Sequence, residues 1–442
     1  MICPSCSAPN VDSAEACFTC GRALSALTQG LVIAGRYQIE SVLGKGGMGM
    51  VYRAHDRMLD ETVAIKVLRS ELANTAEMLK RFKYEIKLAR KVSHRNVCRI
   101  HEYGEDGGVR YISMEYVEGT DIKQLARERG GFLEAAEAFD VAIQTADGLQ
   151  AIHDVGIVHR DLKTSNIMRD PGGRVRLMDF GIAKSEAGDA SSGGSSLTST
   201  GQIMGTPEYM SPEQCLGDKI DHRSDIYALG IAIYEIFTGT VPFRGDTAVA
   251  TLFKHLQDPV PFEGPVAARI PLAAVPVLRK ALAKNRADRF STSAELAEAL
   301  RRAHLQALHG VISDVAPTSG LPAIVPPGET TPAPAERRRV TRLDIFVNFK
   351  IRRLGTAGTV LQEERTIAEN VGRGGVRVCT SMASLGPGDV VHLEEVGGPF
   401  KTRAEVRGTY VGKDNIRRLN LRFLDSPAPD YLVHVDDTAP RR

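Results

Sequence analysis

The sequence predicts a multidomain α+β protein. A chain of 442 residues is long enough for roughly two to four domains. Three observations support this: four cysteines lie in the first twenty residues, strand-like segments followed by helices fill the middle, and short alternating strands follow a stretch with six prolines. The expected parts are a cysteine-containing segment at 1–28, a large domain at 37–302, a linker at 303–335, a small antiparallel β-barrel at 336–426 and a disordered tail at 427–442.

Composition narrows the class of protein and its compartment. The net charge is +2 and 25% of residues are charged, so nothing global favours nucleic acid as the main partner. No apolar run is long enough to span a bilayer, and the first residues are no signal peptide, so we expect a cytoplasmic protein. Cys98, Cys215 and Cys379 are isolated and are expected to be reduced packing or surface thiols.

The amino-terminal cysteines form two pairs with metal-binding spacing. Cys3 and Cys6, and then Cys17 and Cys20, are each separated by two residues, so that each pair can hold one side of a tetrahedral Zn²⁺ ion. The segment has almost no apolar core, so the metal would supply its folding energy. It resembles a short zinc ribbon. A disulfide or redox pair is the alternative, and the near absence of basic residues favours a structural or protein-docking role.

The chemistry concentrates between Val158 and Gly181. Transfer of a phosphoryl group to a hydroxyl needs a carboxylate that orients and deprotonates the hydroxyl, here Asp161, and a cation that offsets charge on the moving group, here Lys163. It also needs ligands for divalent cations, here Asn166 and Asp179.

This string resembles the catalytic loop and metal-binding motif of eukaryotic-type protein kinases. The resemblance covers Tyr37 to Arg302 and implies a bilobal protein-kinase fold that binds ATP with Mg²⁺ or Mn²⁺ and acts on protein substrates. A nucleotide-binding scaffold without catalysis, with a protein-interaction tail, is the alternative.

A glycine-rich segment and a lysine indicate the nucleotide site. Leu43 precedes the pattern Gly-x-Gly-x-x-Gly-x-Val, which consists of Gly44, Gly46, Gly49 and Val51. Glycines allow the backbone to approach phosphates closely. Lys66, in Val-Ala-Ile-Lys, follows at the spacing of a paired strand.

A helix and a strand complete the expected nucleotide-binding lobe. Residues 76–92 have helical apolar spacing, and Glu85 lies within the apolar face, where burial of a carboxylate requires a cation. Lys66 is the expected partner. By resemblance, residues 111–119 supply the hinge, with Met114 as gatekeeper and backbone groups of Glu115 and Val117 on the adenine.

The segment after Asp179 carries the expected switch and the substrate class. Residues 185–200 are mostly serine, glycine and threonine, and phosphate on Thr198 or Thr200 would order them through Arg160. Trans-autophosphorylation there would use a homodimer. Lys163 together with Thr206 is the arrangement of serine/threonine kinases.

Two further pairs are expected to be structural. Residues 225–237 form a helix that is apolar nearly all round, which indicates burial. By resemblance, Asp225 at its start braces the catalytic loop, and Glu213 pairs with Arg289.

The last part resembles a PilZ domain, a family that binds cyclic di-GMP. Arg338 and Arg342 would grip phosphates, and the second motif is here Asn370-x-Gly372-x-x-Gly375. Gly372 stands where the family motif has serine, so one hydroxyl contact is absent, and a barrel that binds protein instead remains the alternative. The sequence thus predicts a serine/threonine kinase modulated by cyclic di-GMP.

Overall fold

The computed structural model describes residue 19 and residues 27–46, 49–68, 76–180, 206–313, 347–355 and 359–433. These residues divide into two compact units. The first contains the amino-terminal sheet together with segments 148–159 and 166–180, and the second contains segments 122–147 and 160–165, the remaining helices and a carboxy-terminal barrel. We call the kinase-like parts of these units the small-lobe unit and the large lobe.

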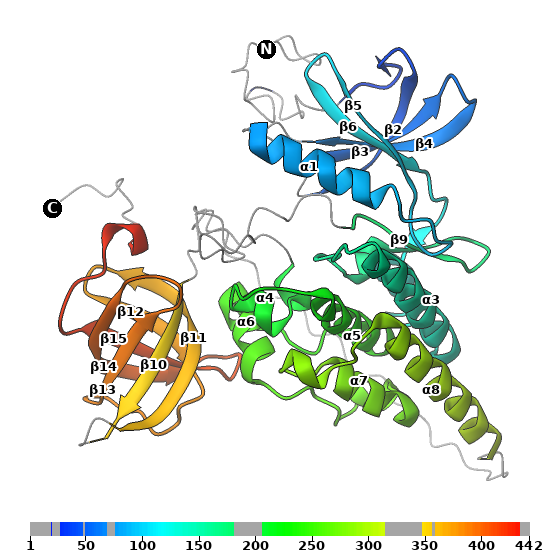
Figure 1. Cartoon of the computed structure of the whole chain (residues 1–442). Helices are drawn as coiled ribbons and strands as arrows, with labels where there is room; N and C mark the ends of the chain where they lie inside the picture. Colours follow the sequence, from blue (N-terminus) through cyan, green and yellow to red (C-terminus); the bar gives the residue numbers. More distant parts are fainter. Residues whose placement is uncertain are drawn as a thin grey trace. The chain divides into compact units, whose positions relative to one another are not determined.

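The small-lobe unit is built on a six-stranded antiparallel sheet in the order β1-β2-β3-β4-β6-β5, with α1 beside it (Figure 1). Its elements are β1 Val32–Ile33, β2 Tyr37–Gly46, β3 Gly49–Asp56, β4 Glu61–Leu68, α1 Ala76–Ala89, β5 Ile100–Asp106 and β6 Val109–Glu115. Phe82 of α1 packs edge-on against Tyr103 of β5. This contact attaches the apolar face of the helix to the sheet, as the periodicity predicted.

A small three-stranded sheet also belongs to the small-lobe unit. Its strands are β7 Thr120–Asp121, β8 Ile167–Arg169 and β9 Val175–Leu177. Strand β8 pairs antiparallel with β9, and Ile167 lies opposite Leu177. The residues on either side of this hairpin, Asn166 and Met178, are therefore brought to the same end of it.

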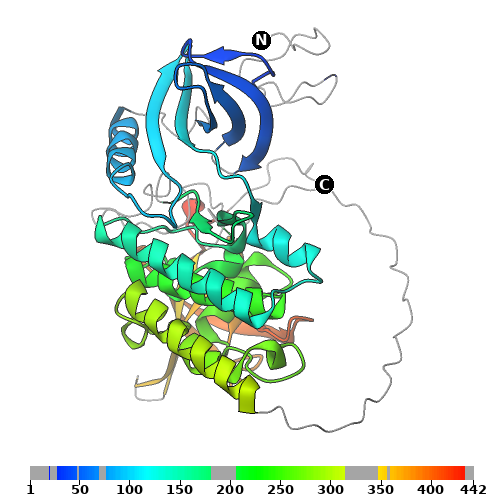
Figure 2. The same ribbon diagram turned by 90° about the vertical axis from the view of Figure 1, so that its right-hand side faces the viewer.

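The large lobe is helical and is organised around α5, whose residues are nearly all buried. Its helices are α2 Ile122–Glu128, α3 Ala135–Asp154, α4 Pro212–Cys215, α5 His222–Thr238, α6 Ala248–Gln257, α7 Val275–Ala281 and α8 Ser293–Ser313. The part of α3 from Gly148 onward belongs to the small-lobe unit. Phe139 of α3 stacks on His304 of α8, and these two helices run side by side (Figure 2). Helix α8 continues to Ser313, so the expected linker at 303–335 begins with helix.

A buried histidine makes the large lobe sensitive to acid. Burial, with a contribution from the Lys284 cation, lowers the pKa of His255 from 6.5 to about 3. Its Nδ1 lies 3.0 Å from the Tyr227 hydroxyl. The unfolded chain takes up a proton below pH 6.5, whereas the folded chain stays neutral until about pH 3, so stability falls between these values.

We therefore expect the free energy of unfolding to decrease by about 2 kcal/mol between pH 7 and pH 5 through His255 alone. Urea unfolding at both pH values measures it. In His255→Gln the loss over this interval should be correspondingly smaller, whatever the stability of the variant at pH 7. An equal loss in both proteins would show that His255 does not cause the pH dependence.

The carboxy-terminal part is a closed antiparallel barrel in the order β10-β11-β12-β15-β14-β13. Its strands are β10 Asn348–Leu354, β11 Val360–Gly372, β12 Gly375–Thr380, β13 Val390–Glu395, β14 Lys401–Val411 and β15 Arg417–Phe423. Alternate residues point inward and form one core, which includes Phe349, Val378 and Leu421. The small antiparallel barrel predicted from the sequence is confirmed, although the long strand β11 was not foreseen.

The end of the barrel also differs from the prediction of a tail from residue 427. Ala428 and Leu432 are both 4% exposed and belong to the barrel core, with a short 3₁₀ turn at Asp430–Leu432. Burial of these two apolar side chains holds residues 428–433 on the barrel. Within the described part of the chain, no helix has the length and apolarity needed to cross a membrane.

Candidate active site

Residues of the glycine-rich segment and Lys66 lie opposite one another on neighbouring strands of the small-lobe sheet. Gly44 of β2 is opposite Val51 of β3, and Val51 is opposite Lys66 of β4. Gly49 has a φ of 145°, and a Cβ there would lie 1.8 Å from the Val67 carbonyl oxygen. This glycine is thus required by the turn itself and by the close approach of β4. This arrangement places the Lys66 backbone two strands from the first glycine of the segment.

The carboxylate paired with Lys66 is not the expected one. Lys66 Nζ lies 2.7 Å from Asp179 Oδ1, and the Lys66 side chain is only 5% exposed. The sequence predicts Glu85 as the partner of this cation. Glu85 is half-buried on α1, but in this structure the ion pair of Lys66 is with Asp179. Either carboxylate could neutralise a nearly buried ammonium group.

The two expected metal ligands lie at the same end of the β8–β9 hairpin. The Asn166 carbonyl oxygen accepts a hydrogen bond from the Met178 N–H at 2.9 Å, and Asp179 follows directly. A carboxylate and an amide oxygen are the hard donors that Mg²⁺ uses together with substrate phosphates. The donor set therefore fits a divalent cation. A φ of 56° at Asp179, unusual for a residue with a side chain, aims this carboxylate.

The expected hinge follows the last strand of the sheet. Met114 is buried in β6 and Glu115 ends that strand, with Val117 just beyond. The Glu115 N–H donates to the Arg99 carbonyl oxygen at 2.8 Å, and its carboxylate accepts from Arg176 Nε at 3.1 Å. The Glu115 backbone is thereby fixed in place by contacts on both its N–H and its side chain.

In the large lobe, the Lys163 ammonium group contacts both Asp161, the expected general base, and the hydroxyl group of Thr206. Lys163 Nζ lies 3.1 Å from Asp161 Oδ2 and donates to Thr206 Oγ1 at 3.3 Å. Asp161 is mostly shielded, with 18% of its side chain exposed. The expected contact among Asp161, Lys163 and Thr206 is present. A carboxylate held in this way can accept a proton while the adjacent ammonium offsets negative charge.

The catalytic loop is braced from α5 as expected. Arg160 has a φ of 66°, which turns its N–H toward Asp225 Oδ1 at 2.9 Å. A left-handed conformation at an arginine costs energy and persists only when its surroundings hold it. Asp225 is 1% exposed, and its carboxylate stabilises this conformation of Arg160 through the hydrogen bond. The backbone immediately before Asp161 is therefore fixed by a buried hydrogen bond.

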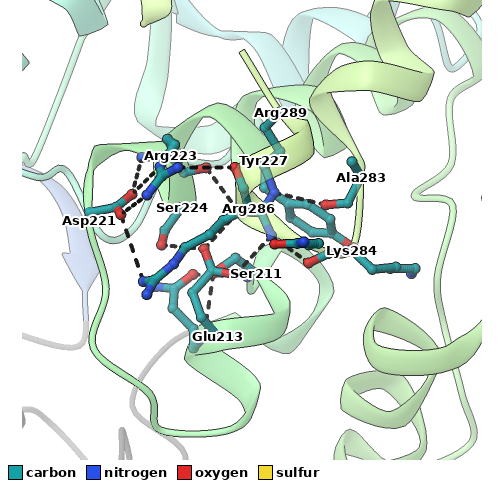
Figure 3. A network of polar contacts seen from close by, with 12 residues as sticks. Ser211, Glu213, Asp221, Arg223, Ser224, Tyr227, Ala283, Lys284, Arg286 and Arg289 are labelled. Carbon is teal, nitrogen blue, oxygen red and sulfur yellow. Dashed lines mark hydrogen bonds and ion pairs between the residues drawn. The ribbon is translucent and has the colours of Figure 1, made fainter. Parts of the chain in front are cut away.

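A buried ion pair secures α4 to the rest of the large lobe (Figure 3). Arg289 makes two hydrogen bonds to Glu213, at 2.7 and 2.8 Å, and Ser224 Oγ donates to the same carboxylate at 2.5 Å. Burial alone would raise the pKa of Glu213, but these hydrogen bonds outweigh burial and keep the pKa below its usual value. The pair expected from the resemblance is therefore confirmed.

A polar cluster that the sequence does not predict lies beside Thr206. Thr164 Oγ1 donates to the Glu235 carboxylate at 2.8 Å and lies 3.1 Å from the Tyr209 hydroxyl, which also donates to Glu235. These residues line a cavity of about 460 Å³ that Thr206 and three basic side chains also border. The basic residues are Lys123, Arg127 and Arg244. The signal that could have revealed this cluster is Glu235 itself, a carboxylate in an otherwise apolar helix.

Several expected site residues lie outside the part of the chain that the structure describes. They are Cys3, Cys6, Cys17, Cys20, Thr198, Thr200, Arg338 and Arg342. Among the described residues, no group of three or more histidine, cysteine or acidic side chains could hold a metal ion. Zinc binding, activation-segment phosphorylation and the arginine grip on a dinucleotide stay predictions.

The other three residues of the expected dinucleotide motif lie in the β11–β12 hairpin. Asn370 is exposed, and Gly372 pairs with Gly375 across the turn. A Cβ at Gly375 would lie 2.3 Å from the Leu421 carbonyl oxygen, so the barrel itself requires this glycine. A Cβ at Gly372 would meet only one atom within 4 Å, at 3.7 Å. Sterically, therefore, a serine fits at position 372.

Comparison with known proteins agrees with this geometry. The chain is 40% identical over 279 residues to the probable serine/threonine-protein kinase PknB of Corynebacterium glutamicum. The aligned region covers 61% of this chain and 42% of that protein. It is 40% identical over 286 residues to the kinase pkn3 of Myxococcus xanthus, covering 63% and 51%, and 39% identical over 264 residues to PrkC of Bacillus subtilis, covering 60% and 40%. The matched part is about half the length of these relatives or less.

A solved structure and a family model cover the same region. The crystal structure of the Mycobacterium tuberculosis PknI kinase domain matches 63% of this chain and all of that domain, with 29% identity and a TM-score of 0.50. The family model described as the protein kinase domain matches residues 37–301, which is more than half of the chain. By this match, and with lysine, aspartates and asparagine in place, the chain belongs to the protein kinase family.

Proposed function

We propose that the chain is a serine/threonine protein kinase that transfers the γ-phosphoryl group of ATP to protein hydroxyls. The observation that carries the proposal is the contact of Lys163 with both Asp161 and Thr206. A shielded carboxylate with an ammonium beside it is what the attacking hydroxyl and the moving phosphoryl group require. The relatives named as serine/threonine kinases support the substrate class.

The residues of the small-lobe unit would hold the nucleotide. Lys66 is the cation for the phosphates, and Gly44, Gly46 and Gly49 allow the loop backbone to approach them. Asn166 and Asp179 would hold Mg²⁺, which neutralises the β- and γ-phosphates when it is bound. Asp179 would hold Mg²⁺ with the same carboxylate that pairs with Lys66 here, and Lys66 would contact the nucleotide phosphates.

The test is transfer of radiolabelled γ-phosphate to a protein substrate, followed by identification of the phosphorylated amino acid. We expect phosphoserine or phosphothreonine and no phosphotyrosine. Lys66→Met should reduce kcat/KM by roughly 10²–10³-fold, because the phosphates lose their buried cation. Lys91→Met, which removes an exposed lysine, is the control.

The rival function is a scaffold that binds nucleotide and signals by contact. It predicts ATP binding without transfer, so a wild-type protein that binds ATP and shows no more transfer than Lys66→Met would favour it. The structure supports the enzyme over the scaffold because Asp161 and Asp179 are both present and held by contacts.

Regulation by phosphorylation is part of the proposal. Thr198 and Thr200 are the proposed autophosphorylation sites, within a homodimer that phosphorylates in trans. Mass spectrometry of the purified protein before and after incubation with ATP would locate the phosphate. Phosphate that appears only on other residues would exclude these two threonines.

Two further proposals concern the ends of the chain. Cysteines 3, 6, 17 and 20 would bind one Zn²⁺, which metal analysis of the protein would detect and a fourfold Cys→Ser variant would lose. The barrel, as a PilZ-like module, would bind cyclic di-GMP, supported by the exposed Asn370 beside an open Gly372. Calorimetry on the full chain and on Arg338→Ala tests it, and absence of heat in both would favour a protein-binding barrel.

A further inference from the structure

Two side chains on the outer face of the barrel are buried although they do not belong to its core. In β11 and β12 the inward residues include Ala368 and Val378, so the adjacent Ile367 and Cys379 point outward. Outward residues of a free barrel are exposed to water. Ile367 is nevertheless 1% exposed and Cys379 0%.

The large lobe covers them. Ile367, Cys379 and Ile416 form one apolar cluster with residues of α4, of α6 and of the segment just before α4. The large-lobe members are Met210, Cys215, Val249, Ala250, Leu252 and Phe253. An apolar cluster of this kind is what holds two parts of a protein together when both contribute to it.

Polar contacts surround this cluster. Arg365 Nη1 donates to Asp218 Oδ2 at 3.0 Å, and the neighbouring strand contributes Asn348, whose Nδ2 donates to the Leu216 carbonyl oxygen at 3.1 Å. Thr247 Oγ1 donates to Glu369 at 3.4 Å. Arg365, Ile367 and Glu369 are alternate residues of β11 and therefore lie on one face of the strand. This face makes an ion pair, an apolar contact and a hydrogen bond with the large lobe.

The segment contacted by the barrel also contacts the catalytic loop. Gln214 of α4 donates from Nε2 to the Arg160 carbonyl oxygen at 3.3 Å, and its Oε1 accepts from the Ser211 N–H. Arg160 directly precedes Asp161. At the other end of the same segment, Thr206 accepts from Lys163. Residues 206–218 therefore connect the barrel to both ends of the Asp161–Lys163 pair.

We propose that the barrel docks on the α4–α6 face of its own large lobe and, through residues 206–218, positions the catalytic loop. The α4–α6 face is thus occupied by a part of the same chain, and other proteins cannot bind there while the barrel is docked. Arg365, Ile367 and Gln214 are positioning residues, because none of them is placed on a substrate or on a reacting atom. Only the effect on turnover rests on the proposed kinase function.

Thiol labelling of the full-length protein tests docking without any assay of activity. Cys379 is 0% exposed and lies in the cluster shared with the large lobe, so a maleimide should modify it slowly in the wild type. Ile367→Asp puts a carboxylate into the apolar cluster, and we expect Cys379 to be labelled at least tenfold faster. Peptide mass spectrometry separates Cys379 from the other cysteines, and buried Cys98 of the small-lobe unit should be unchanged.

Two controls separate undocking from misfolding. Val390→Asp makes a similar change at an outward barrel residue that is already 45% exposed, and labelling should not change. Hydrogen exchange of the β12 and β15 amides should stay slow in Ile367→Asp if its barrel is folded. If Ile367→Asp misfolds, the ion pair between Arg365 and Asp218 provides a second test. We expect Asp218→Arg and Arg365→Glu each to speed labelling of Cys379. The double variant, in which the two charges are exchanged, should restore slow labelling.

Turnover gives the second readout. In the undocked variants we expect kcat for a protein substrate to fall at least threefold with an unchanged KM for ATP, and the charge-exchanged double variant to recover. Wild-type Cys379 that is labelled as fast as in Ile367→Asp would overturn docking. A kcat that is unchanged or higher on undocking would overturn the positioning role. A protein without any kinase activity would refute the proposed function, while labelling would still decide docking.

Discussion

Asp161→Asn is expected to reduce phosphoryl transfer to protein by about 10²–10⁴-fold, the range for loss of a general base. The asparagine keeps the shape of the side chain but cannot accept the proton of the attacking hydroxyl. Lys163, which lies 3.1 Å from the carboxylate, also loses its negative partner. ATP affinity should stay within twofold, because Lys66 and Asp179 are untouched. Steady-state kinetics with a protein substrate, together with calorimetry of ATP binding, measures both quantities.

The matched control is Asp140→Asn, the same substitution on α3, where the carboxylate accepts a hydrogen bond from Gln144 one turn along the helix. Its activity should equal that of the wild type. If Asp161→Asn retained more than a tenth of wild-type kcat, Asp161 would orient the substrate rather than take its proton. A pH profile without the acidic limb in the variant would point to its role as base.

Arg289→Met is expected to destabilise the large lobe by about 3–5 kcal/mol, because it leaves the Glu213 carboxylate buried without its cation. The Arg289 side chain is 0% exposed and the Glu213 side chain 8%. Since the folded pKa of Glu213 lies below its usual 4.5, the carboxylate contributes stability above that pH and loses it as the pH falls. Urea unfolding at pH 7 measures the loss.

Arg301→Met provides the comparison within the same lobe. Arg301 pairs with Asp147 at 2.6 Å, but its side chain is 43% exposed, so water compensates for the lost pair. The cost should stay below about 1 kcal/mol. Similar losses in the two variants would show that burial does not determine the strength of the Glu213 pair. The double variant Glu213→Gln with Arg289→Met should recover part of the stability, because it leaves no buried charge.

Much of the site could be predicted from the sequence because its parts are local motifs. Asp161, Lys163 and Asn166 are close in the chain, and the glycine pattern and Lys66 occur on consecutive strands. The contact between Glu213 and Arg289 spans 76 positions, and only the family resemblance indicated it. Periodicity gave no information on which carboxylate pairs with Lys66, since it shows only which face of α1 is apolar.

The strand missed in the barrel has a physical reason as well. Strand β11 begins with exposed residues, including Val360 and Leu361, and contains charged residues where a half-buried strand would alternate. From Thr366 to Ala368 both of its faces are buried, one in the barrel core and one against the large lobe. A strand with two buried faces lacks the period-two pattern by which strands are recognised. Burial of β11 against the large lobe therefore explains why the sequence pattern does not indicate this strand.

The cluster shared by the barrel and the large lobe also has a practical consequence for producing the enzyme. A chain shortened after Ser313 would keep every catalytic motif but would expose the apolar side chains of α6, among them Val249 and Phe253. Uncovered apolar patches promote self-association. The isolated catalytic domain should therefore precipitate or form oligomers at concentrations at which the full chain stays dispersed, and polar replacements on α6 should restore its solubility.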